Sequence, residues 1–117
     1  MVTQKVDYQM IKVKIKPISV NACWKGRRFK TPAYVKFEKV TLMLLPKMII
    51  PKGRLGINFI FGFSNDSADW DNPIKPIQDI LQKKYLFNDK DIHEATVKKT
   101  KVKKGEEYFE FEIYSIK

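Results

Sequence analysis

The stretch Leu55-Gly56-Ile57-Asn58-Phe59-Ile60-Phe61-Gly62-Phe63 decides the fold, because apolar side chains occupy every odd position in it. Small or polar residues take most of the even positions. A period of two residues is typical of a strand, whose successive side chains point to opposite faces of a sheet. We therefore predict a strand with one buried face. The glycines on its other face leave room for the close approach of another layer.

Three further strands are predicted around this one. Residues 10–16 alternate apolar residues with lysines until Pro17 stops the strand. Residues 92–103 and 108–116 are the other two, with a hairpin at Gly105 between them, and residues 19–30 have no period and are predicted to be a loop.

Two helices complete the expected order. Thr31 followed by Pro32 is typical of a helix N-cap and first turn, and Pro46 ends that helix. Asn72 followed by Pro73 predicts a second start, before a stripe of apolar residues that ends at Tyr85. The order β-α-β-α-β-β predicts one α+β domain over residues 1–117, with a mixed β-sheet and two helices.

Composition excludes several classes of protein. The chain has 117 residues, of which 44% are hydrophobic, so it can bury a core. Its single cysteine, Cys23, excludes a disulfide framework and a cysteine-based zinc site, and its single histidine, His93, excludes a multi-histidine metal centre. No apolar run is long enough to cross a membrane, and lysines interrupt the start of the chain where a signal peptide would lie. We expect a soluble cytoplasmic protein that does not bind membranes.

The charges are distributed unevenly. The net charge of +10 favours a polyanionic partner such as DNA. Residues 1–65 carry 13 basic and 2 acidic side chains, whereas residues 66–94 carry 4 basic and 7 acidic ones. More than half of the 13 acidic residues therefore lie in one short window of a basic chain.

Three aspartates of this acidic window are candidate metal ligands. Asp69 and Asp71 project to the same side if the backbone between them is extended. Asp89 follows the second predicted helix and reaches them only if a strand returns alongside the first. Oxygen ligands without His or Cys suit Mg²⁺ or Mn²⁺. The alternative is that Asp69 or Asp71 only caps the helix.

Lys75 is the candidate for stabilising charge on a phosphate. Asp71, Lys75 and Asp79 follow one another at helical spacing and share a face. A lysine one turn beyond a metal-binding carboxylate can meet a phosphate oxygen in the transition state. Alternatively, Lys75 only forms a surface ion pair with its neighbours.

The pattern Asp69-Trp70-Asp71-Asn72-x-x-Lys75-x-x-x-Asp79-x-Leu81, with Asn88-Asp89-x-x-Ile92 downstream, resembles the RusA-type Holliday junction resolvases, a prophage-associated group of endodeoxyribonucleases. The resemblance implies a homodimer that cuts four-way DNA junctions by paired, symmetric, Mg²⁺-dependent nicks. It implies that Asp69, Asp71 and Asp89 bind the metal and that Lys75 is catalytic. Many members have a second aspartate at the position of Asn88, and Asp91 has no assigned role.

Two basic segments are the expected DNA contacts. The first lies in the predicted loop at residues 19–30 and combines basic with aromatic side chains, which suits phosphate contacts and stacking on unpaired bases. The alternatives are a solvated loop and, for the second segment, lysines that pair across strands with Glu110 and Glu112. The expected contacts are Asn21, Trp24, Lys25, Arg27, Arg28 and Lys30 in the first segment and Lys98 and Lys101 in the second.

The leading interpretation is a metal-dependent, junction-resolving endonuclease. One alternative is a nuclease for flaps or other branched DNA. The other is a non-catalytic nucleic-acid-binding module, in which the acidic residues only cap helices and balance charge.

Overall fold

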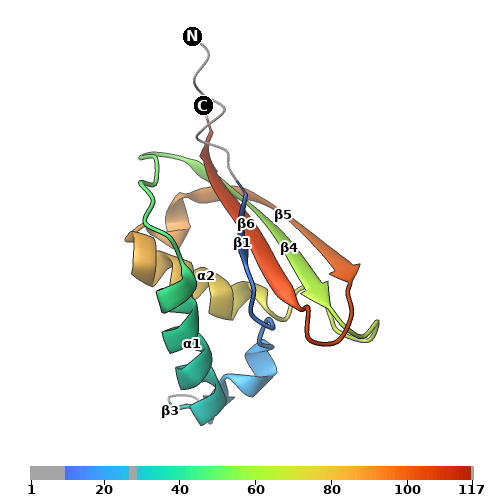
Figure 1. The fold of residues 1–117 in the computed structure, drawn as a ribbon. Coiled ribbons are helices and arrows are strands. Elements are labelled where there is room, and N and C mark those ends of the chain that lie inside the picture. Colours follow the sequence, from blue (N-terminus) through green and yellow to red (C-terminus); the bar gives the residue numbers. More distant parts are fainter. Residues whose placement is uncertain (1–9, 27–28, 117) are drawn as a thin grey trace.

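The computed structural model describes residues 10–26 and 29–116, and in it two helices cover one face of a four-stranded sheet (Figure 1). The strand order is β1-β6-β4-β5, and the helices are α1 (Pro32–Leu44) and α2 (Ile74–Tyr85). Strand β6 (Tyr108–Ser115) runs antiparallel to both β1 (Ile11–Val13) and β4 (Leu55–Phe63), whereas β4 runs parallel to β5 (Ile92–Lys101). The predicted α+β fold with a mixed sheet is confirmed.

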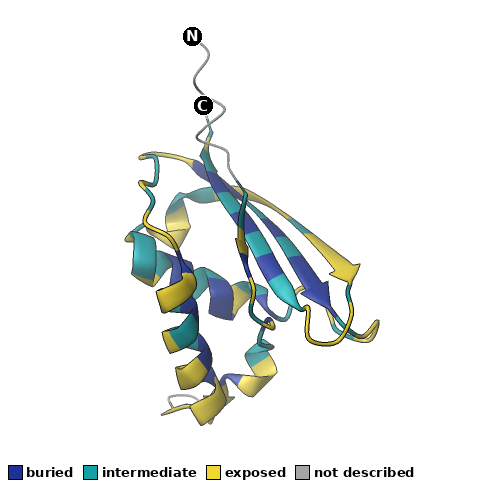
Figure 2. Ribbon diagram, in the orientation of Figure 1, coloured by how far each residue is buried: buried dark blue, intermediate teal, exposed yellow. Residues whose placement is uncertain are grey.

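The buried face of the sheet follows the period of two residues. All the odd residues of β4 are buried, and the rings of Phe59 and Phe61 stack with their centroids 5.4 Å apart. Strand β6 presents Phe109, Phe111 and Ile113 to the same core, so buried and partly exposed residues alternate along it (Figure 2). Helix α2 closes this core with Ile77, Ile80 and Leu81, which are fully buried.

The other face of β4 is covered differently from the prediction. Instead of another layer, tyrosine rings of the neighbouring strand β6 lie over the two glycines. Tyr114 is the register partner of Gly56 and Tyr108 that of Gly62, and a Cβ atom at either glycine would overlap the ring. The Tyr114 hydroxyl reaches past Gly56 and donates a hydrogen bond of 2.6 Å to Glu94 on β5. The glycines therefore serve the packing of side chains within one sheet.

The first helix begins as predicted and the second does not. The Thr31 hydroxyl accepts a hydrogen bond of 3.2 Å from the backbone N–H of Tyr34, and Pro32 is the first helical residue. At α2, residues 70–73 form a turn, and Pro73, without a side-chain cap, precedes the first helical residue. The predicted N-cap at Asn72 is wrong because its carbonyl accepts from Val20 N–H at 2.9 Å while its side chain donates to Asp69.

Two connections also differ from the prediction. Strands β5 and β6 do not form a hairpin at Gly105, because β4 lies between them in the sheet. The expected loop at 19–30 contains a 3₁₀ turn, η2 (Val20–Ala22), and a small antiparallel pair, β2 (Trp24–Lys25) and β3 (Phe29–Lys30). Across residues 10–26 and 29–116, no helix has the length and apolarity to span a membrane.

The packing of Tyr114 on Gly56 gives a stability prediction. Gly56→Ala should lower the free energy of unfolding by about 1–3 kcal/mol, because the added methyl group displaces the ring. Chemical denaturation measures the change. In a Tyr114→Ala background the same substitution should cost clearly less; an equal cost in both backgrounds would contradict the packing account.

Candidate functional site

The loop between β4 and α2, residues 64–73, is fastened to the edge strand β5. The ammonium of Lys99 donates to the carbonyl oxygens of Ala68 at 2.7 Å and Asp66 at 3.2 Å. Lys101 Nζ also lies 3.2 Å from the Asp66 carboxylate. Trp70, which is 53% exposed, lines a hollow together with residues 95–97 of β5. The loop therefore runs along β5, and Asp69 and Asp71 lie within this fastened segment.

Lys75 projects from the first turn of α2 toward two carboxylates. Its Nζ lies 3.0 Å from Asp79 Oδ1 and 4.0 Å from Asp89 Oδ2. The contact with Asp79 is the ion pair at helical spacing that the sequence offered as the alternative. The contact with Asp89 depends on a chain reversal at Leu86, which ends α2 in the left-handed conformation with φ 58°. Because of this reversal, a residue beyond the end of the helix lies beside its first turn.

Asp89 opens a short 3₁₀ turn, η3 (Asp89–Asp91), directly before β5. The Asn88 side chain caps this turn by accepting from the backbone N–H of Lys90 at 3.0 Å. Asn88 therefore caps the η3 turn at the position where many members of the family that the sequence resembles have a second aspartate.

The three candidate metal ligands are not assembled into one group. Asp69 accepts a hydrogen bond of 3.4 Å from the Asn72 amide, and Asp89 lies beside Lys75. Among residues 10–26 and 29–116, no three His, Cys, Asp or Glu side chains lie close enough together to hold a metal ion. The carboxylate donors suit Mg²⁺ chemically, but this arrangement supplies no three-ligand site. The metal site stays a prediction.

The strand register explains the separation of the aspartates. Ala68, next to Asp69, contacts Lys99, whereas Asp89 lies just before Ile92, the first residue of β5. Lys99 and Ile92 are roughly 23 Å apart along the strand at the usual rise per residue. Strand β5 does return alongside β4, as the prediction required, but it places these two segments near opposite ends of itself.

The first basic segment is partly engaged with the rest of the protein. The Trp24 ring packs edge-on against Tyr34 with a centroid distance of 5.7 Å, and Lys30 pairs with Glu38 at 3.1 Å. Phe29 is 73% exposed. Asn21 and Lys25 are also exposed, whereas Arg27 and Arg28 lie outside the described residues. Contact of this segment with DNA stays a prediction.

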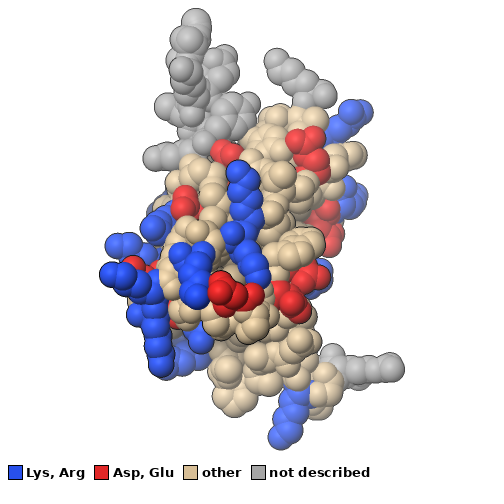
Figure 3. Space-filling view, turned by 90° about the vertical axis from the view of Figure 1, so that its right-hand side faces the viewer, with Lys and Arg blue, Asp and Glu red and all other residues tan. Residues whose placement is uncertain are grey.

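The lysines of β5 divide between the two faces of the sheet. Lys98 is the register partner of Ile60 and shares the face that the helices leave open, whereas Lys101 pairs with Asp66 of the fastened loop. The alternative interpretation, in which these lysines pair across strands with Glu110 and Glu112, is wrong, because β4 separates β5 from β6. Figure 3 views the molecule from the right-hand side of Figure 1 and shows basic side chains on both sides of acidic ones. Lys98 is therefore the freer of the two predicted DNA contacts on β5.

Asp79 also acts on the environment of Cys23. The thiol is fully buried and donates a hydrogen bond of 3.3 Å to the Ser19 carbonyl. Burial, and secondarily the negative charge of Asp79, raise the pKa of Cys23. The same two causes, in the same order, raise the pKa of Tyr34. The negative charge of Asp79 therefore acts on Cys23, within the first basic segment, and on Tyr34 beside it.

The raised pKa of Cys23 predicts that its thiol reacts slowly. At pH 8 a raised pKa leaves less thiolate, so Cys23 should react with a disulfide reagent more slowly than free cysteine. Asp79→Asn removes one cause of the raised pKa and should speed the reaction, whereas Asp91→Asn should not. Equal rates for the two variants would contradict the role assigned to Asp79.

Neither a protein-family model nor a curated protein matches the sequence. The case for a function therefore depends on the chemistry and geometry of the residues described above.

Proposed function

We propose that the chain is a metal-dependent endodeoxyribonuclease that cuts four-way DNA junctions. The observation that supports this most is the contact between Lys75 and Asp89, which brings together a candidate residue from the first turn of α2 and one from beyond its end. Asp71 lies one helical turn before Lys75 in the sequence. A cation next to carboxylates in a basic protein is the arrangement that phosphodiester hydrolysis uses.

Lys75 would stabilise the extra negative charge of the phosphate in the transition state. Its side chain is 61% exposed, so a phosphate oxygen can approach the ammonium from solvent. Asp79 at 3.0 Å limits the directions that the side chain takes and keeps it beside Asp89. Fixing a charged donor before the reaction reduces the reorganisation that stabilising the transition state requires.

Asp69, Asp71 and Asp89 would hold the metal. A bound Mg²⁺ supplies an activated water and neutralises phosphate charge. No three-ligand group exists among the described residues, and β5 holds the loop and the η3 turn roughly 23 Å apart. A shared metal site would therefore require the loop to leave its contacts with Lys99 and Lys101. Asp89 would also exchange its contact with Lys75, which releases the ammonium toward the phosphate.

The DNA would meet the basic surface around these carboxylates. The net charge of +10 attracts phosphates, and the exposed Lys25, Phe29 and Lys98 offer both ionic and stacking contacts. A four-way junction has two equivalent strands to cut, so a two-fold homodimer with two sites is the matching assembly.

A second candidate is a DNA-binding protein without catalysis. The absence of a three-carboxylate group among the described residues favours it, because the acids would then serve only ion pairs and turns. Activity on flaps or other branched DNA is a variant of the first proposal. Comparing four-way junctions, flaps and linear duplexes at one salt concentration separates these possibilities.

Asp71→Asn tests the carboxylates. It should reduce Mg²⁺-dependent cleavage of a synthetic four-way junction to background and leave junction binding equal or tighter, because it removes a metal ligand and one negative charge. The matched control, Glu106→Gln, removes a negative charge from the connection between β5 and β6 and should cleave normally. Full cleavage by Asp71→Asn would remove the proposed site.

Lys75→Ala tests the ammonium. It should lower the single-turnover cleavage rate by about 100-fold with a much smaller change in the Kd for the junction, since the contact forms mainly in the transition state. Lys47→Ala removes an exposed lysine after α1 and serves as the control. If both variants cleave at the wild-type rate, Lys75 is only a surface residue.

A further inference from the structure

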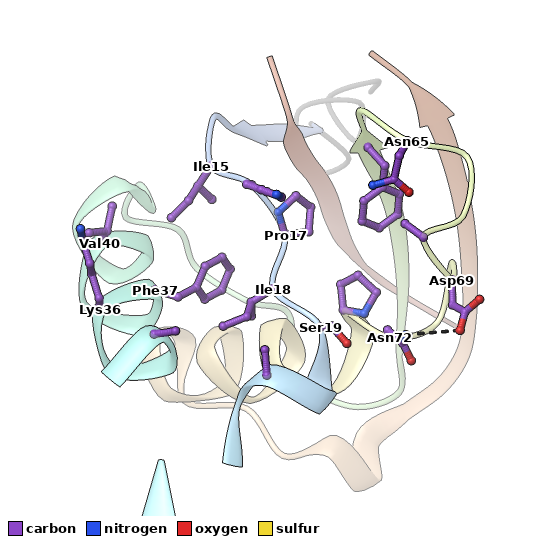
Figure 4. Close-up of a pocket in the computed structure, with 16 residues that line it drawn as sticks. Ile15, Pro17, Ile18, Ser19, Lys36, Phe37, Val40, Asn65, Asp69 and Asn72 are labelled. Atoms are coloured by element: carbon purple, nitrogen blue, oxygen red, sulfur yellow. Dashed lines mark hydrogen bonds between the residues drawn. The ribbon is translucent and has the colours of Figure 1, made fainter. Parts of the chain in front are cut away.

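An apolar cavity of about 690 Å³ lies next to Asp69. It is bordered by residues 15–19 after β1, by one side of α1 and by the loop that follows β4. In Figure 4, Ile18 and Phe37 lie on the α1 side, whereas Asn65, Asp69 and Asn72 lie on the opposite side. The cavity thus shares a border with a residue of the proposed catalytic site.

The walls of the cavity combine flat apolar surfaces with a polar rim. Phe37 and Phe63 contribute aromatic rings to the walls, and Pro17 and Pro73 contribute their pyrrolidine rings. The polar groups at the border are the Ser19 hydroxyl, the amides of Asn65 and Asn72 and the Asp69 carboxylate, and two exposed lysines, Lys16 and Lys36, complete it. Its volume lies within the range of about 300–1,000 Å³ that is usual for small-molecule sites.

We infer that this cavity receives an unpaired nucleobase of the DNA strand whose phosphate lies at Asp69. The inference rests on the proposed function and adds a base-binding site to it. A base offers apolar faces to the rings and prolines and a hydrogen-bonding edge to the amides, and its flanking phosphates suit Lys16 and Lys36. Bases at a branch point are the easiest in a junction to unstack.

The charges at the rim argue against the other occupants. An apolar peptide would not use the charges of the two lysines. A two-fold-related copy of the chain would bring a second Lys16 and Lys36 to the same rim, where like charges repel. A nucleotide offers the apolar faces of its base to the walls and its phosphates to Lys16 and Lys36.

Fluorescence of a modified base tests the inference. The probe is a four-way junction with 2-aminopurine at the branch point, with Ca²⁺ replacing Mg²⁺ and anisotropy of a second label reporting binding. Wild-type protein should raise the 2-aminopurine signal as the base leaves its stacked neighbours. Val40→Phe, which fills the cavity from α1, should reduce that rise at least about fivefold. Val35→Phe, on the same helix but outside the cavity lining and 51% exposed, should leave it unchanged.

Each result decides the inference. Equal signals from the two variants, or a flat signal from bound wild-type protein, overturn the base site, and normal Mg²⁺-dependent cleavage alongside them leaves the proposed function intact. If the wild type does not bind the junction, both fail. If Val40→Phe unfolds, Ala33→Phe, at an exposed position of the lining, takes its place. If filling the cavity dissociates a DNA-free dimer, a second copy is the occupant and the inference is wrong.

Discussion

The parallel pairing of β4 with β5 is the constraint on which the candidate chemistry depends. Parallel neighbours cannot be joined by a tight turn, so the chain must return from the end of β4 to the beginning of β5. That return consists of the loop at 64–73, helix α2 and the η3 turn. Nearly all of the acidic window, residues 66–94, falls within it. The uneven charge of the sequence is therefore the charge of one crossover connection.

Lysines from inside and outside this crossover balance its carboxylates. Lys99 and Lys101 on β5 hold the loop by its carbonyls and by Asp66, and Lys75 lies between Asp79 and Asp89. These contacts are exposed, so each one stabilises the fold only modestly. Their larger effect is on position, because they hold the loop against β5 and the Lys75 ammonium beside Asp79 and Asp89. Binding of metal and of DNA to such a surface is expected to be coupled.

Local sequence patterns predicted the main strands and helices but not which strands lie next to one another in the sheet. The alternation of β4 and the Thr31-Pro32 start of α1 are properties of short segments, and both are confirmed. The position of β4 between β5 and β6 is set by tertiary packing, which a period of two residues does not encode, so the predicted hairpin at Gly105 is wrong. The Asn72 cap failed for a similar reason, since contacts with Val20 and Asp69 occupy that residue.

The candidate site was predictable to a similar extent. Helical spacing predicted the Lys75–Asp79 pair, whereas the Lys75–Asp89 contact requires the reversal at Leu86, which carries no glycine signal. The hydrogen bonds from Lys99 to carbonyl oxygens of the loop could not be predicted, because main-chain acceptors have no sequence signature. The apolar cavity was not foreseen, because its walls come from three separate segments of the chain.

We propose that the carboxylates of the fastened loop and of the η3 turn serve one cation. Titration of the isotope-labelled protein with Mn²⁺, followed by the loss of backbone amide NMR signals, tests it most directly. The account predicts that signals from residues 69–71 and 89–91 broaden together, with one midpoint. Broadening of one segment alone, or of neither at concentrations that support nuclease activity, would contradict a shared metal site.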